Sequence, residues 1–511
     1  MRRAPRGLAL MLWAASGAAC GDEATAPAPA GELARPESPP AAGRLAEPPT
    51  IVLITLDTLR REHLGCYGYF RPTSPHLDAL AREALLFERA LASMASTLPS
   101  HLTLLTGLYA HQHGMTSNRR GASVSFTSEL GRLSAADVLQ RCGYRTAAFV
   151  SAVPLAPTTG VGAGFETYSS PLPGRAGESG AAPQPSSLRA GERNPEVLAW
   201  LAQQAGRPGP FFLWVHYFDP HEPNDPLPPY DASFATDAAQ LDWIRARGIV
   251  PRALAERYGR SSRVQHQFFG SSRAERGEGL TLEHIADLMN RYDGEVRYMD
   301  EHVGALLEAL RRHGRYEDAI VVVAGDHGQS LGENDWFGHG TITNVNAFVP
   351  LIVRLPRSIA PPPQRIGALV SLADVLPTLM ARFSLPGSEL LLAQFEGEDV
   401  LSGSFARDRA LVQRSADEVK DSKTRREVAL LAGRWKLLAR ADGELELFDL
   451  GGAGESEDVL ARHADLAARL RAELDDALAR RPALLVDETP AEADADLLKG
   501  LEELGYGGEG E

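Results

Sequence analysis

The sequence predicts an α/β fold: a mostly parallel central sheet flanked by helices, followed by a smaller C-terminal α+β subdomain with an antiparallel sheet. Residues 51–56, 210–216 and 319–324 are continuous apolar runs rich in β-branched and aromatic residues, as expected for parallel strands buried on both faces. Segments with helical periodicity alternate with them, which favours an α/β arrangement. The hairpin signal at residues 442–443, between two strand-like segments, indicates the antiparallel sheet.

The chain of 511 residues is long enough for a large core with a smaller partner. We expect the α/β domain over residues 50–385, the C-terminal subdomain over 386–485 and an acidic tail over 486–511. The net charge of −15 and the absence of any stretch dense in lysine and arginine argue against nucleic-acid binding.

The N-terminus has the layout of a secretory signal, with arginines before an apolar run that is too short to span a bilayer. Residues 1–20 end in a lipobox-like stretch in which Gly17 stands where leucine is usual. We expect lipidation at Cys20, with a plain cleaved signal or an uncleaved anchor as alternatives. Residues 21–49, rich in Ala, Pro and Glu, then form a disordered linker. We therefore expect the protein to be exported to the periplasm or cell envelope.

The remaining elements follow from apolar periodicity and turn residues. We expect helices over residues 77–84, 97–107, 133–141, 241–247, 282–312, 372–381 and 459–480, and strands over 87–91, 146–150, 350–354, 428–438 and 444–450. Residues 169–192 and 224–279 are interpreted as insertions, which usually shape or cover a pocket. Cys66 and Cys142 could pair in an exported protein, but nothing in the sequence indicates that they are close.

Acidic and histidine side chains follow two of the apolar strands directly. Asp57 ends the first strand, and Asp326 with His327 follows the strand at 319–324, flanked by glycines. The carboxyl ends of parallel strands are where open α/β sheets place their sites, and carboxylate oxygen with imidazole nitrogen suits divalent ions. The alternatives are that Asp57 caps a turn and that Asp326 lies in a polar surface loop.

Thr97 precedes a short apolar helix that ends at Gly107, a position typical of a left-handed C-cap. Either Thr97 or Ser96 is merely an N-cap, or Thr97 presents its hydroxyl where the helix N-terminus stabilises an anion. His221 lies in a proline-bounded loop and His339 between two glycines; both are candidate site residues. His216 lies within the strand at 210–216 and is expected to be packed.

Five segments occur in the order of a known family: VLITLDTLRREHLGCYGY, TLPSHLTLLTGLYAHQHGM, FDPHEP, VVVAGDHGQSLGE and GRWKLLARADGELELFDL. Over nearly all of residues 50–480 the chain resembles the sulfatase family of the alkaline phosphatase superfamily. The resemblance implies an alkaline-phosphatase-like fold. It also implies that Asp57, Asp326 and His327 bind a divalent metal that Thr97, at the nucleophile position, touches. His221 and His339 would bind the ester oxygens or protonate the leaving group.

Three residues depart from the family pattern. Thr58 replaces a second metal aspartate, and His101 replaces the signature arginine, which removes a bidentate anion-binding fork and makes His101 the substrate-binding candidate there. Thr97 stands where the family has the cysteine or serine that is oxidised to formylglycine. Because threonine carries a methyl group on its carbinol carbon, oxidation could give only a ketone, and no formylglycine is expected.

The sequence therefore predicts a metal-dependent hydrolase that cleaves sulfuric or phosphoric esters through Thr97, with calcium, manganese or zinc as the cofactor. The substrate would be a glycan, lipid or small-molecule ester. A phosphodiesterase or a phospho-headgroup transferase acting on envelope lipids or glycans is an alternative, as is an inactive protein that binds anionic ligands. A second metal held by Asp219, His221 and His339 also stays open, and so does the oligomeric state.

Overall fold

The computed structural model describes residues 41–123, 125–126, 133–171, 185–258, 280–405, 409–416, 427–452, 454–480 and 494–506. The expected signal with Cys20 and most of the expected linker lie outside these residues. Among the helices of the described residues, none combines the length and the apolar character needed to cross a membrane.

An eight-stranded sheet forms the centre of the molecule, in the order β10-β2-β9-β6-β1-β5-β3-β4. Five of the seven strand pairings are parallel, and only β9 runs against both of its neighbours. The strands are β1 (Ile51–Leu56), β2 (Leu85–Leu91), β3 (Arg145–Phe149), β4 (Thr167–Ser169), β5 (Phe211–Tyr217), β6 (Ile320–Gly325), β9 (Phe348–Arg354) and β10 (Gln364–Ser371). The predicted fold class is confirmed.

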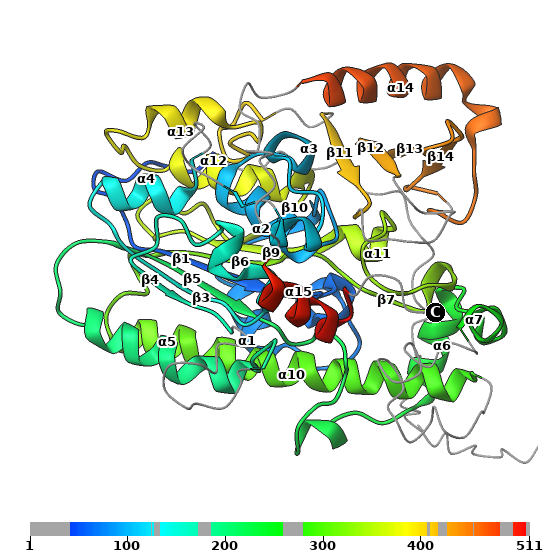
Figure 1. Cartoon of the computed structure of the whole chain (residues 1–511), viewed down its shortest axis with the longest axis horizontal. Helices are drawn as coiled ribbons and strands as arrows, with labels where there is room; N and C mark the ends of the chain where they lie inside the picture. The colour runs from blue at the N-terminus through cyan, green and yellow to red at the C-terminus, as the bar shows by residue number, and fades with distance from the viewer. Residues whose placement is uncertain are drawn as a thin grey trace, which may run out of the picture.

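Helices cover both faces of this sheet (Figure 1). The long α10 (Leu282–Arg312) covers one face together with α5 (Ala190–Gln204) and α1 (Pro75–Ala81), while α2 (Thr97–Thr106), α4 (Ala135–Arg141) and α12 (Val375–Met380) cover the other. Alternate residues of β1 belong to different cores: Ile51 and Leu53 pack with α2, and Val52 and Ile54 pack with α10. This alternation explains why the strand is apolar at every position.

The C-terminal subdomain is a four-stranded antiparallel sheet covered by α14 (Ala464–Ala479). Its strands are β11 (Ala410–Arg414), β12 (Val428–Ala432), β13 (Trp435–Ala439) and β14 (Leu445–Asp449). The expected single strand over 428–438 is wrong, because a two-residue turn at Gly433 and Arg434 divides it, with Ala432 paired to Trp435. Gly433 has φ of 56° there, a conformation that glycine adopts readily. Strand β11 was not predicted at all.

Several shorter elements refine the expected boundaries. Both expected insertions contain ordered helices, since α5 begins at Ala190 and the second insertion holds α6 (Ala238–Ala246) and α7 (Pro251–Tyr258). The expected helix over 372–381 is a 3₁₀ turn (Leu372–Asp374) followed by α12, and the one over 459–480 is a 3₁₀ turn (Leu460–Arg462) followed by α14. Within the expected acidic tail, α15 (Ala495–Leu501) packs Leu497 and Leu501 against Val153 and Ala156. Cys66 and Cys142 are not paired with each other.

Candidate active site

The site is built where the central strands end. Strands β1 and β6 are parallel neighbours in register, with Leu56 opposite Gly325, so the residues that follow them, Asp57 and Asp326, emerge side by side. Strand β5 lies on the other side of β1, with Thr55 opposite His216. All these side chains are buried, which places the site at the carboxyl edge of the sheet, as in other open α/β folds.

Helix α2 begins at this edge, and its first turn is tied to the β6 end. Thr97 is the first helical residue and Ser96 occupies the N-cap position, so the alternative that Thr97 is the N-cap is not supported. Ser100 Oγ donates to the Asp326 carbonyl at 2.6 Å, and the Leu98 amide donates to Asn118 Oδ1 at 2.8 Å. Thr97 Oγ1 is fully buried without a hydrogen-bond partner among the described residues. Gly107 closes the helix with φ of 69°, as predicted.

Asp57, Asp326 and His327 bring ligand atoms within 4.8 Å of one another. His327 Nε2 lies 3.7 Å from Asp57 Oδ1 and 3.5 Å from Asp326 Oδ2. Asp326 Oδ1 is held by the amides of Thr58 (3.2 Å) and His327 (2.7 Å). His327 Nδ1 donates to the Gly328 carbonyl at 3.1 Å, so the ring keeps its lone pair on Nε2. This second-layer hydrogen bond is typical of metal-binding histidines.

The donor set fits a divalent cation. Both Asp57 oxygens, Asp326 Oδ2, His327 Nε2 and Thr97 Oγ1 are buried and make no hydrogen bond among the described residues. Two fully buried carboxylates this close are costly unless a positive charge compensates them. Burial raises the pKa of Asp57 to about 6, and burial together with the Asp57 charge raises the pKa of Asp326 well above its ordinary value. Burial and neighbouring His339 lower the pKa of His327 well below 6.5, which keeps that ring neutral and able to bind a metal.

His221 and His339 lie together beside His327. The ring centroids of His221 and His339 are 5.3 Å apart, and those of His339 and His327 are 4.5 Å apart. His221 Nδ1 donates to the Glu222 carbonyl at 2.7 Å, and His339 Nδ1 donates to the Ala95 carbonyl at 3.2 Å, so each ring carries its lone pair on Nε2. His221 stacks on Phe218 at 4.5 Å. Burial lowers the pKa of both histidines.

Glu222, and not Asp219, completes a second set of ligand atoms with His221 and His339. Atoms of His221, Glu222 and His339 lie within 4.8 Å of one another. Asp219 points elsewhere, because its Oδ2 accepts from the Ala190 amide at 2.8 Å and Oδ1 lies 4.0 Å from Arg189 Nη1. The sequence had left open a second metal set with Asp219, and the path of the loop brings Glu222 to His221 and His339 instead.

His101 is held by the protein through both ring nitrogens. Nδ1 donates to the Thr97 carbonyl at 2.7 Å, so Nε2 accepts from Thr55 Oγ1 at 2.9 Å, and Trp214 Nε1 donates to that same hydroxyl at 3.0 Å. Burial and nearby His216 lower the pKa of His101 well below 6.5. A neutral ring with both nitrogens engaged favours a role in holding Thr97 over the predicted contact with substrate.

Sequence reasoning missed the contact that His216 makes. The residue is buried, as expected, but its Nε2 lies 3.4 Å from Asp57 Oδ2. The sequence did place His216 near the carboxyl end of a predicted strand, where site residues of open α/β sheets lie. Only the pairing of β5 with β1 shows that it meets Asp57.

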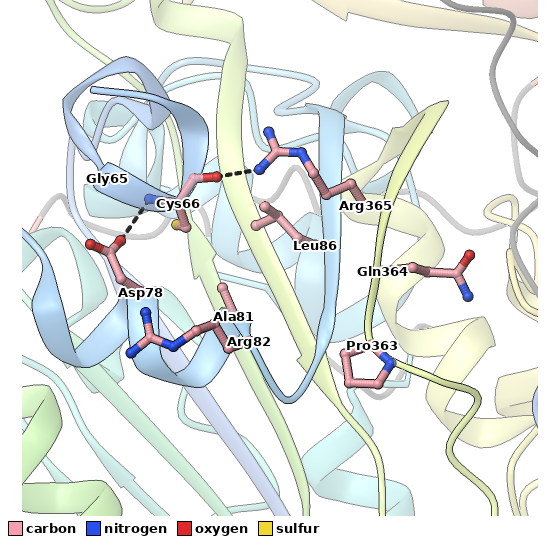
Figure 2. Close-up of a pocket in the computed structure, with 9 residues that line it drawn as sticks. All are labelled: Gly65, Cys66, Asp78, Ala81, Arg82, Leu86, Pro363, Gln364 and Arg365. Atoms are coloured by element: carbon pink, nitrogen blue, oxygen red, sulfur yellow. Dashed lines mark hydrogen bonds between the residues drawn. The ribbon is translucent and has the colours of Figure 1, made fainter. Parts of the chain in front are cut away.

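A separate pocket of about 410 Å³ lies between α1, β2 and the start of β10 (Figure 2). Cys66, Asp78 and Arg365 line it, with Arg365 donating to the Cys66 carbonyl and the Cys66 amide donating to Asp78. None of the candidate site residues lines this pocket.

The sulfatase family model matches residues 49–385, about two thirds of the chain. The chain belongs to the sulfatase family. The predicted family is thereby confirmed, and with it, at the level of the family, the expectation of a sulfatase-like ester hydrolase.

Individual relatives agree with this membership. N-sulphoglucosamine sulphohydrolase of Homo sapiens is 30% identical over 332 residues, which cover 63% of this chain and 58% of the human protein; the match thus spans less than two thirds of that relative. Among solved structures, the phosphonate monoester hydrolase of Silicibacter pomeroyi is similar with a TM-score of 0.62 and 20% identity, covering 84% of this chain and 95% of that one. A protein solved in complex with D-glucosamine-2-N,6-O-disulfate has a TM-score of 0.63 and 20% identity, covering 84% and 97%. These structural likenesses confirm the alkaline-phosphatase-like fold.

Proposed function

We propose that this protein is a metal-dependent ester hydrolase that uses Thr97 as its nucleophile and cleaves sulfuric or phosphoric esters. The observation that carries the proposal is the buried, unpartnered Oγ1 of Thr97 at the start of α2. The His101 ring links this residue to the acidic pair, with Nδ1 at 2.7 Å from the Thr97 carbonyl and 3.7 Å from Asp326 Oδ2. A buried hydroxyl whose burial no hydrogen bond offsets is costly to keep, and a nucleophile is a role that explains it.

Asp57, Asp326 and His327, with Thr97 Oγ1, would hold the divalent cation. When bound, the ion supplies Lewis-acid stabilisation of the ester oxygens and lowers the pKa of the threonine alcohol. A ligand set that includes an imidazole suits manganese or zinc better than calcium, which prefers oxygen ligands. We propose these residues as the metal set on the strength of the donor atoms that the protein leaves unsatisfied.

The neutral histidines are suited to moving protons. His221 and His339 both have an unprotonated Nε2, because Nδ1 donates to a backbone carbonyl. One of them would accept the Thr97 proton as the oxygen bonds to phosphorus or sulfur, and would then give this proton to the departing alkoxide. Water attacking the covalent threonine ester in line would release phosphate or sulfate and regenerate the hydroxyl. The ordinary pathway of the family, through formylglycine, is closed to threonine.

The relatives indicate which acid the ester substrate contains. The relatives include a sulphohydrolase and a phosphonate monoester hydrolase, so we propose an ester of sulfuric, phosphoric or phosphonic acid as substrate. A sulfated glycan is the first candidate, since one similar structure holds a disulfated glucosamine. An exported, lipid-anchored location, through Cys20, would give access to envelope substrates and remains part of this proposal.

The test compares wild type, T97A and T97S on aryl sulfate, aryl phosphate monoester and aryl phosphodiester, with manganese, zinc or calcium added to metal-stripped protein. We expect turnover of at least one ester by wild type, partial turnover by T97S and a loss of roughly 10³-fold or more for T97A. An acceptor alcohol added to the assay separates hydrolysis from transfer. Equal rates for wild type and T97A would refute the proposal, and metal binding without turnover of any ester would favour an inactive binding protein.

A further inference from the structure

His216 is a buried histidine placed directly behind Asp57. It lies on β5 opposite Thr55 of β1, and Thr55 and Asp57, two residues apart, project from the same face of the sheet. The His216 side chain is fully buried, and Nε2 lies 3.4 Å from Asp57 Oδ2. The opposite oxygen, Asp57 Oδ1, is 3.7 Å from His327 Nε2. One carboxylate oxygen thus faces the candidate metal residues and the other faces His216.

The ring of His216 is oriented differently from the rings of the candidate site histidines. Its Nδ1 accepts a hydrogen bond from the Ser151 amide at 3.4 Å, so the neutral ring carries its proton on Nε2. In His221, His327 and His339 the proton is on Nδ1 instead, because Nδ1 donates to a backbone carbonyl. Those three rings carry a lone pair on Nε2, whereas the His216 Nε2–H lies 3.4 Å from Asp57 Oδ2 without forming a hydrogen bond in this structure.

We propose that His216 is a positioning residue: its Nε2–H, 3.4 Å from Asp57 Oδ2, closes to a hydrogen bond in the metal-loaded protein and restrains the carboxylate so that Oδ1 stays available to the cation. This inference rests on the proposed metal-binding role of Asp57. Ligating carboxylates are commonly hydrogen-bonded by such outer partners, whose loss weakens metal binding 10- to 100-fold. His101, His216 and Asp326 also bring ligand atoms within 4.8 Å of one another. Because the hydrogen bond from Ser151 leaves the His216 proton on Nε2, we assign His216 to the surroundings of the metal set and not to the ligands.

Two parts of the chain hold the turn whose Ser151 amide orients the His216 ring. The Ser151 carbonyl accepts from the Leu188 amide at 2.8 Å, and the Val153 amide donates to the Ser186 carbonyl at 3.0 Å. Val153 also packs against Leu497 and Leu501 of the C-terminal α15. The turn after β3 is thus clamped from two sides, which keeps the Ser151 N–H directed at His216.

The test measures metal affinity in three variants of the full chain, by competition with a chromogenic chelator using zinc and manganese alone. H216F keeps a ring of similar size without a donor, H216N keeps an acceptor for the Ser151 amide but does not reach Asp57, and H216Q retains an N–H at the distance of Nε2. We expect H216F and H216N to bind metal about 10- to 100-fold more weakly than wild type and H216Q to stay within about threefold. H302F, which replaces a histidine on α10 outside the site, is the matched control.

The outcomes separate this inference from the proposed function. Wild-type affinity in H216F or H216N would overturn the positioning role and leave the proposed function standing. Equal weakening in all three variants would also overturn it, because it would mean that the ring and not the N–H donor is required. Wild type that binds neither metal would overturn both. If H216F does not fold, the metal affinities of H216N and H216Q are compared, and only H216Q should stay close to wild type.

Discussion

The ionised carboxylate of Asp57 should lower the stability of the metal-free protein. Burial raises the pKa of Asp57 from 3.8 to about 6, so the folded protein holds this proton more tightly than the unfolded chain does. Stability contributed by the protonated form is present at low pH and is lost as pH rises from about 4 through 6. At 1.36 kcal/mol per pKa unit, the free energy of unfolding falls by about 3 kcal/mol by pH 8. The amide introduced by D57N cannot ionise, so this variant should be about 3 kcal/mol more stable than wild type at pH 8 without metal.

The assay is urea unfolding of metal-stripped wild type and D57N at pH 5 and pH 8. The advantage of D57N should be about half as large at pH 5, where Asp57 is largely protonated in the folded state. Metal at 1,000 times the dissociation constant should reverse the order at pH 8, because wild type then gains about 4.1 kcal/mol and D57N should gain little. D57N that is no more stable than wild type at pH 8, or an advantage that does not change with pH, would refute the reasoning.

Two further predictions concern residues outside the reacting atoms. Burial and the Asp219 charge raise the pKa of Glu295 to about 8, so Glu295 should contribute to the loss of stability of wild type between about pH 4.5 and 8. E295Q should lose less stability than wild type over this range, and a thermal-unfolding series over pH checks this. Deleting residues 494–511 should expose Val153 and Ala156, against which α15 packs, lower the midpoint of thermal unfolding and weaken metal binding through Ser151. Unchanged metal affinity in the truncated protein would separate α15 from the site.

Much of the site could be predicted because it follows strands that are visible in the sequence. The apolar runs of β1 and β6 end at Asp57 and Asp326, and two parallel neighbours in register must present these residues together. The C-terminal sheet was predicted less well, because apolar residues flank Gly433 and Arg434 on both sides and the segment was taken as one strand. The Gly-Arg pair is a weaker hairpin signal than the Asp-Gly pair at residues 442–443.

The contacts that depend on long-range pairing could not be read from residue types. His216 meets Asp57 only through the alignment of β5 with β1, and Glu222 in place of Asp219 follows from the path of one loop. His101 looked like a substitute for an anion-binding arginine, but its two nitrogens are taken by the Thr97 carbonyl and Thr55. In each case, a partner distant in sequence decides the role.

The most direct test of the central claim is mass spectrometry of the peptide that contains Thr97, taken from metal-loaded protein that is quenched during turnover of the preferred aryl ester. The account predicts unmodified threonine before substrate is added, and threonine that carries one phosphoryl or sulfuryl group during turnover. The modification should be absent from T97A. A Thr97 peptide that stays unmodified during burst-phase turnover, or one already oxidised before substrate is added, would contradict the account.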